Sequence, residues 1–164
     1  MILGIVLLLV ALQRIAEVVY AESNSRRLLA RGAIELAREQ HPWFVALHTA
    51  WLLAMWLFIP HETVPNWWLI GCFVALQCLR VWALASLGPY WTTRLITLPG
   101  APLVRRGPYR FMRHPNYTVV VLELAVLPLA FGAWMLALAF SVLNGALLAW
   151  RIRVENSALA KRAT

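Results

Sequence analysis

The sequence predicts an all-α, polytopic membrane protein with about five transmembrane helices, and three observations support this class. First, 62% of the 164 residues are hydrophobic and only seven are Asp or Glu, which leaves too little polar surface for an ordinary soluble domain. Second, several apolar runs approach the ~20 residues that a helix needs to cross a bilayer core of about 30 Å. Third, the basic residues that give the net charge of +8 collect beside these runs. Nucleic acid is therefore excluded as a partner, because binding it requires a basic face on a soluble fold.

The N-terminal part predicts two spans and a polar segment between them. The first span is residues 1–20, and because no positive residue precedes it, we interpret it as a retained span and not as a cleaved signal. Residues 21–41 mix Arg with Leu and Ile in a pattern typical of an amphipathic helix at the membrane interface, which Gly32 is expected to break in two. The second span is residues 43–59. We expect residues 1–60 to form a helical hairpin with its interfacial segment.

The C-terminal part predicts three more spans. The third span is residues 67–87, and a long irregular stretch rich in Arg, Gly and Pro follows it over residues 88–114. The fourth span begins at Pro115, since proline fits the first position of a helix, and ends at residue 130. Three residues then allow only a tight hairpin before the fifth span, residues 134–150, which continues as a helix beyond the membrane.

The placement of positive charge predicts the orientation. Apart from Arg80, every Lys and Arg lies near or in the segments after the first, third and fifth spans, and the turns after the second and fourth contain none. Basic segments face the cytoplasm, so the N-terminus is expected outside and the C-terminus inside. We find no repeat or linker that divides the chain, and we expect one integral membrane domain over residues 1–164, with the catalytic helices and cofactor pocket in residues 66–164.

Polar chemistry gathers in residues 107–117. There the start of the fourth span offers free N–H groups and the charge of Arg113, a combination that favours an anion such as a carboxylate. Arg151 and Glu155 are four residues apart and share one face of the fifth helix. As an isolated pair they are worth a few tenths of a kcal/mol. The tight hairpin, however, must bring the start of the fourth span and the end of the fifth to the same membrane face. The expected pocket is lined by Arg113, His114, Asn116, Tyr117, Arg151 and Glu155.

Such a pocket offers a cation for a carboxylate, a carboxylate for an ammonium group and an aromatic ring for a flat ring. These are the groups that an amino-acid-derived cofactor presents. Two further charges, Arg80 and Glu123, lie deep in the third and fourth spans, where an unpaired charge is costly, so we expect them to pair, with Glu17 and Gln13 as weaker competitors for Arg80. This pair is either a structural salt bridge or a device that binds or activates a polar group of a substrate.

Other chemistries are not indicated. His41, His48 and His61 do not have the spacing of metal ligands, so no metal site is expected. The sequence contains neither a Ser, His and acid pattern nor a Gly-rich phosphate loop.

The motifs in the C-terminal half resemble those of the isoprenylcysteine carboxyl methyltransferase family of integral membrane enzymes. The matching pieces are Leu98-Pro99-Gly100, Gly107-Pro108-Tyr109, Arg113-His114-Pro115-Asn116-Tyr117 and the R-x-x-x-E-x-x-x-L pattern from Arg151 to Leu159. The N-terminal half looks like the bacterial branch of this family, some members of which act on alkyl pyrones or phenolic lipids. This resemblance implies a bacterial inner membrane location.

The resemblance also implies S-adenosyl-L-methionine as the cofactor. The residues implied to bind it are Tyr109, Arg113, His114, Pro115, Asn116, Tyr117, Arg151 and Glu155. Within this set we expect Arg113 and the backbone after His114 to meet the cofactor carboxylate, Glu155 its ammonium group and Tyr117 its nucleoside. The sequence departs from the family where a second acid usually follows Glu155, because Asn156 stands there. The chain also lacks the longer tail of many relatives, so residues 98–104 are expected to cover the cofactor.

The expected reaction is methyl transfer to a carboxylate, phenol or enol oxygen of a lipophilic small molecule or prenylated substrate, which reaches the site from the membrane lipids. Arg80, Glu123 and Arg151 are the candidate catalytic residues. Glu123 is the expected base for a phenol or enol, and Arg80 is expected to position a carboxylate. Two alternatives stay open, a phospholipid N-methyltransferase and a non-catalytic scaffold or transporter subunit. The sequence does not fix the oligomeric state.

Overall fold

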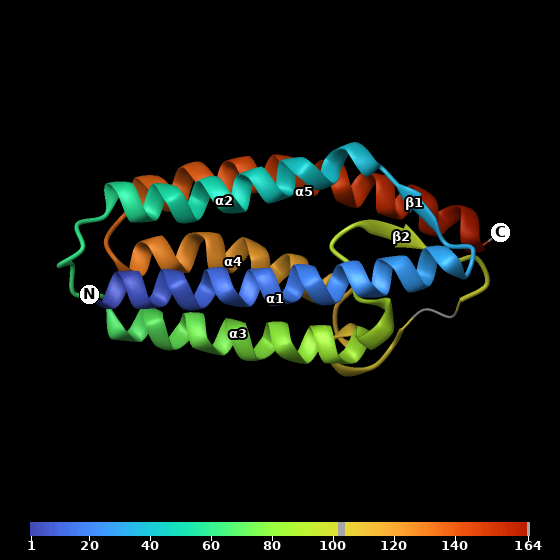
Figure 1. The fold of residues 1–164 in the computed structure, drawn as a ribbon, viewed down its shortest axis with the longest axis horizontal. Helices are drawn as coiled ribbons and strands as arrows, with labels where there is room; N and C mark the ends of the chain where they lie inside the picture. The colour runs from blue at the N-terminus through green and yellow to red at the C-terminus, as the bar shows by residue number, and fades with distance from the viewer. Residues whose placement is uncertain (102–103, 164) are drawn as a thin grey trace.

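A computed structural model describes residues 1–101 and 104–163, with side chains described as far as Ser157. Five α-helices in this part of the chain form an elongated bundle (Figure 1). The helices are α1 (Ile2–Ala30), α2 (His41–Phe58), α3 (Trp67–Leu87), α4 (Pro115–Ala130) and α5 (Trp134–Ala163). The N-terminus, the α2–α3 turn and the α4–α5 hairpin lie at one end of the bundle, and the C-terminus lies at the other (Figure 1). The predicted helical class and the helix start at Pro115 are therefore confirmed.

Three of the described helical segments are long and apolar enough to cross a membrane. They are Ile2–Ala30, Trp67–Tyr90 and Trp134–Ser157. Helix α4 is also apolar but has only 16 residues. Many large apolar side chains point outward from the bundle, among them Leu9, Leu57 and Val142. Because a protein in water rarely exposes so much contiguous apolar surface, this exterior suits a hydrocarbon environment and supports the predicted membrane class.

The prediction of a separate interfacial helix over residues 21–41 is wrong. Helix α1 continues without a break to Ala30, since no Gly or Pro occurs between Ile5 and Arg31 to interrupt it. Gly32 does end the helical path, as predicted, with a φ of +87° that favours glycine. Beyond it the chain forms strand β1 (Ile34–Leu36) and the 3₁₀ turn Arg38–Gln40.

A small two-stranded sheet, which the sequence did not predict, accompanies the helices. Strand β1 pairs antiparallel with strand β2 (Leu95–Thr97), so that Ile34 lies opposite Thr97 and Leu36 opposite Leu95. These strands of three residues each lie at the C-terminal end of the bundle (Figure 1). They join the connection after α1 to the connection after α3, and together they form part of one end of the cavity described below.

The core of the bundle is a cluster of apolar side chains from all five helices. Helix α2 packs along α5, and α3 packs along α4, as Figure 1 shows. Buried members of the core include Leu7, Trp51, Met55, Phe73 and Leu124. Moving a side chain of this kind from water to a fully buried position stabilises a fold by roughly 1.5–3 kcal/mol. Inside a membrane, where the alternative surroundings are lipid, the stabilisation comes largely from tight packing. Helix α1 meets α3 and α4 in addition through long polar side chains.

The 3₁₀ turn η3 (Gly107–Arg110) docks on α3 and positions the segment that leads into α4. Gly107 has a φ of +57°, and a β-carbon added to it would lie 1.9 Å from Ser86 Oγ. Arg106 Nε donates to the Ser86 carbonyl oxygen at 2.7 Å and fixes the same contact. Only glycine therefore fits this close approach. The docking of Gly107 on α3 in turn fixes the positions of Pro108 and Tyr109.

Candidate functional site

The start of α4 and the end of α5 meet in space, as the hairpin between them predicts. Tyr117 Oη donates to Glu155 Oε2 at 2.7 Å, and Arg151 Nε donates to Tyr117 Oη at 3.0 Å. The Tyr117 hydroxyl thus bridges a guanidinium and a carboxylate that lie one helical turn apart on α5. This arrangement confirms the predicted juxtaposition of the two helix ends.

Aromatic rings extend this contact. The His114 ring stacks on Tyr117 with centroids 5.0 Å apart and an interplanar angle of 13°, and its Nδ1 lies 3.7 Å from Glu155 Oε2. The Arg151 guanidinium lies 5.2 Å from the centroid of the Phe44 ring on α2, so it also joins α5 to α2. Arg151 Nη2 donates to the Thr93 carbonyl oxygen at 2.9 Å, and this bond connects α5 to the segment before β2.

These residues form one end of a cavity of about 1010 Å³, which is at the upper end of the range for ligand sites. At this end, called the mouth here, the lining includes Tyr109, Arg113, His114, Asn116, Tyr117, Arg151, Glu155 and Asn156. Every predicted cofactor residue except Pro115 lines the cavity, and Pro115 is buried as the first residue of α4. Burial raises the pKa of the Tyr109 phenol, and the Glu155 carboxylate adds to the rise. Tyr109 is therefore a neutral donor at physiological pH.

Loops from both halves of the chain enclose the cavity. Asn24 Nδ2 donates to the Trp91 carbonyl oxygen at 3.0 Å, and Arg94 pairs with Glu22 at 3.0 Å and with Glu35 at 3.5 Å. Leu98, Ala101 and Val104 also line the cavity, and the expected covering role of residues 98–104 stays a prediction. Residues 102–103 of that segment lie outside the described residues, as does the side chain of Leu159.

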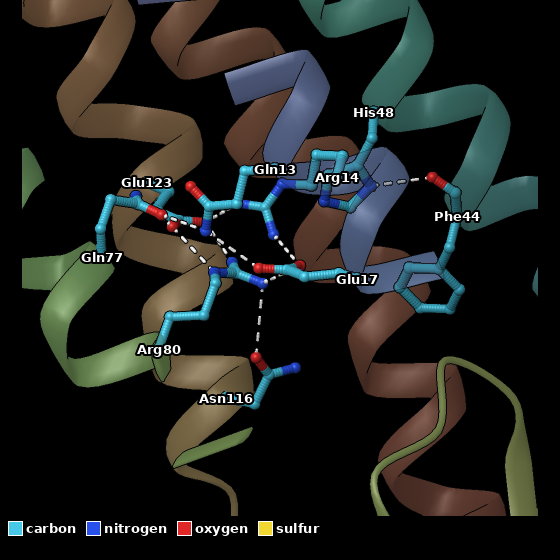
Figure 2. Close-up of polar contacts among 9 residues, drawn as sticks. All are labelled: Gln13, Arg14, Glu17, Phe44, His48, Gln77, Arg80, Asn116 and Glu123. Carbon is cyan, nitrogen blue, oxygen red and sulfur yellow. Dashed lines mark hydrogen bonds and ion pairs between the residues drawn. The ribbon is translucent and has the colours of Figure 1, made fainter. Parts of the chain in front are cut away.

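The deep end of the cavity adjoins a buried network of charged and amide side chains, drawn in Figure 2. Arg80 Nε donates to Glu123 Oε1 at 3.0 Å, and a second contact joins Arg80 Nη2 to Glu123 Oε2. Arg14 Nη2 donates to Glu123 Oε2 at 2.7 Å, and Gln77 donates to Oε1. Arg80 Nη1 reaches Glu17 Oε2 at 3.3 Å and Asn116 Oδ1 at 3.5 Å. The network therefore joins α1, α3 and α4.

The predicted pair between Arg80 and Glu123 is confirmed, and Glu17 joins it. Two guanidinium groups and two carboxylates balance in charge, which lowers the cost of burying them. Arg80 lines the cavity, but Glu123 is only 1% exposed and is not among its lining residues. Both Glu123 oxygens are occupied by donors. This geometry favours a structural role for Glu123 over the predicted role as a base, which stays an untested prediction.

Sequence reasoning did not identify several residues that line the cavity. They are Arg14 of α1 and Phe44, His48 and Thr49 of α2. Glu17, which was expected to compete for Arg80, lines the cavity as well. The available signal was helical spacing, because Phe44 and His48 are four residues apart and Arg14 and Glu17 three apart, so each pair shares a helix face. Among the described residues, no group of three or more His, Cys, Asp or Glu side chains has the arrangement of a metal site.

Comparisons with known proteins point to one family. The model of the isoprenylcysteine carboxyl methyltransferase (ICMT) family matches residues 69–161, which contain η3, α4 and the contact of Tyr117 with Glu155. A Bacillus subtilis (strain 168) protein, "Uncharacterized protein YpbQ", is 38% identical over 151 residues, which cover 90% of each chain. No solved structure matches the chain.

Proposed function

Because this chain belongs to the isoprenylcysteine carboxyl methyltransferase family of membrane methyltransferases, we propose that it transfers a methyl group from S-adenosyl-L-methionine to an oxygen atom of a lipophilic acceptor. The observation that carries the proposal is the convergence of Tyr117, Arg151 and Glu155 at the mouth of a cavity that continues toward the centre of the bundle. The mouth of this cavity is rich in polar groups for a cofactor, and the remainder combines apolar walls such as Val18, Val45 and Leu52 with the charged groups of the deep end.

The residues at the mouth fit S-adenosyl-L-methionine. Glu155 accepts one hydrogen bond on Oε2, and within the described part of the chain its Oε1 has no partner, so it is available to an ammonium group. Arg113 is exposed at the mouth and suits the carboxylate together with the N–H groups at the start of α4. The stacked rings of His114 and Tyr117 suit the flat nucleoside base.

The acceptor enters from the bilayer between α1 and α2. Val18 of α1 and Val45 of α2 line the cavity and are 44% and 48% exposed. These exposed apolar side chains come from two neighbouring helices, and we place the opening between them. Because the opening lies between apolar helix faces, it favours a greasy molecule over a water-soluble one.

We place the protein in the bacterial inner membrane with five spans, the N-terminus outside and the cofactor site facing the cytoplasm. Helices α2 and α4 lie alongside the three longer segments in one bundle (Figure 1), which favours the view that all five cross the membrane. The basic residues gather at the end that carries the mouth of the cavity, including Arg105, Arg110 and Arg153. This distribution supports a cytoplasmic mouth.

In this proposal the chain supplies binding, orientation and exclusion of water. When bound, S-adenosyl-L-methionine supplies an electrophilic methyl group on its sulfonium sulfur. The mouth residues hold the cofactor in one position, and Arg80, which lines the deep part of the cavity and reaches Asn116 Oδ1 of the mouth at 3.5 Å, orients the acceptor oxygen. The covering segment around β2 limits the entry of water.

The test is a methyl-transfer assay on the purified protein in detergent, with S-adenosyl-L-methionine labelled in its methyl group. A long-chain alkylphenol, a fatty acid and phosphatidylethanolamine serve as acceptors. We expect label in an ether or ester product, at least tenfold less product with Glu155→Gln, and no change with Glu62→Gln, which alters an exposed turn at the opposite end of the bundle. Label only in phosphatidylethanolamine would instead identify an N-methyltransferase. If no acceptor is labelled and the cofactor does not bind, the protein is non-catalytic.

A further inference from the structure

One titratable side chain at the deep end of the cavity is not part of the charge network. His48 lies on α2, lines the cavity and is an electrostatic neighbour of Arg14 of α1; both side chains are drawn in Figure 2. His48 is one helical turn deeper than Phe44, whose ring faces the Arg151 guanidinium at the mouth. His48 therefore stands beyond the proposed cofactor site, on the side from which the acceptor comes.

A hydrogen bond to the backbone fixes the protonation pattern of the His48 ring. Its Nδ1 lies 2.8 Å from the Phe44 carbonyl oxygen, and a carbonyl oxygen only accepts, so Nδ1 carries the hydrogen. In the neutral ring the other nitrogen, Nε2, then has a free lone pair. Nε2 has no hydrogen-bond partner in the part of the chain that the structure describes. The ring thus has the same protonation pattern as a histidine that serves as a general base.

The carboxylates near this ring are already paired with guanidinium groups, so His48 is the available base. The charged groups that act on it are Arg14 from α1, Arg80 from α3 and Glu123 from α4, and both arginines pair in turn with Glu17. Each carboxylate accepts from at least one guanidinium, at 2.7 Å in the contacts with Arg14, and such charge-assisted bonds weaken a carboxylate as a base.

We propose that His48 Nε2 accepts the proton of an acceptor hydroxyl group, so that the natural substrate is a phenol or enol with a long apolar chain. This inference rests on the proposed function, and it selects one acceptor class, because a carboxylate is already ionised and needs no base. In the step, the acceptor O–H bond breaks and its proton moves to Nε2, giving an imidazolium. The acceptor oxygen forms a bond to the methyl carbon, and the carbon–sulfur bond breaks with its electron pair left on the neutral thioether. The imidazolium later releases its proton to water.

The direct test needs no cofactor. A nitrophenol with a long alkyl chain absorbs visible light only as the phenolate, so its absorbance reports proton loss in the cavity. We expect the ionisation midpoint of the bound dye to be higher in His48→Asn than in the wild type by about one pH unit or more, because the imidazolium that stabilises the phenolate is absent. Asn keeps a nitrogen donor for the Phe44 carbonyl, and His48→Gln, which instead keeps a polar atom near the position of Nε2, is expected to behave alike. The control is His61→Asn at the opposite end of the bundle.

The second readout compares acceptors of different acidity. With His48→Asn, methylation of an un-ionised alkylphenol is expected to fall roughly 100-fold, whereas methylation of the alkyl nitrophenol at a pH where it is ionised falls less than about threefold. Equal losses for both acceptors, or an unchanged dye midpoint in both variants, would overturn the role of His48. A wild-type protein that fails to bind the dye, or that methylates only a fatty acid, would also overturn it while leaving the proposed methyl transfer intact. Loss of S-adenosyl-L-methionine binding in the wild type would instead reject the proposed function.

Discussion

One buried and one partly buried guanidinium group depend on the carboxylate of Glu123. Arg14 and Arg80 both donate to it, from different helices, and none of the three lies free in water. Glu123→Gln leaves a net positive charge inside the bundle, so we expect a loss of stability of about 3–5 kcal/mol. Thermal unfolding in detergent measures this loss.

Glu22→Gln is the matched control for that experiment. Glu22 pairs with the exposed Arg26 and with Arg94 near the surface, and exposed pairs are typically worth less than about 1 kcal/mol. If Glu123→Gln costs no more than Glu22→Gln, the buried network does not stabilise the fold in the way described here.

At the level of residues, the sequence predicts which charges must pair more readily than it predicts all their partners. Pairing of Arg80 with Glu123 follows because an unpaired charge is too costly at that depth. Arg14 and Gln77 also bind Glu123, and His48 lines the same cavity, but these contacts depend on how far each helix is rotated about its axis. That rotation comes from the packing of all five helices together, and one sequence does not determine it.

Among the structural elements, η3 depends most strongly on a single residue. Gly107→Ala would place a methyl group 1.9 Å from Ser86 Oγ and 2.9 Å from Ser86 Cβ, at a φ of +57° that disfavours alanine. We expect a loss of at least about 2 kcal/mol and weaker S-adenosyl-L-methionine binding, because Tyr109 moves with the turn. Thermal unfolding and calorimetry measure the two effects.

Gly145→Ala is the control for this change. Gly145 is inside α5, and a β-carbon there meets nothing within 4 Å. Alanine is a better helix former by up to about 1 kcal/mol, so this variant is expected to be at least as stable as the wild type. Similar effects of the two substitutions would contradict the docking of η3 on α3.

The long helices were predictable and the small connecting elements were not. Apolar length and Pro115 predict α3, α4 and α5 closely, and the tight hairpin predicts that α4 and α5 meet at the mouth. The continuation of α1 to Ala30 is not evident from hydropathy, because charged residues end the apolar run without interrupting the helix. Strands β1 and β2 have three residues each, too few for a periodic pattern, and they form only because the folded bundle brings them together.

The whole molecule has two chemically different ends, and this difference predicts its orientation. After replacement of Cys72 and Cys78 by Ser, one cysteine is introduced at Glu62 and, in a second variant, at Ser157. A maleimide that cannot cross membranes is expected to label the first in intact cells and the second only after lysis, because the basic end faces the cytoplasm. The opposite labelling pattern would place the cavity mouth outside and contradict the proposed access of a cytoplasmic cofactor.

The central claim is that the contact of Tyr117 with Arg151 and Glu155 forms a cofactor site, and calorimetric titration of the purified protein with S-adenosyl-L-methionine tests it most directly. We predict one binding site in the wild type and about tenfold weaker binding in Tyr117→Phe, which loses hydrogen bonds to two charged groups worth roughly 1.5 kcal/mol. Tyr20→Phe, on the exposed surface of α1, is expected to bind as the wild type does. No binding by the wild type, or equal binding by Tyr117→Phe and Tyr20→Phe, would contradict this account.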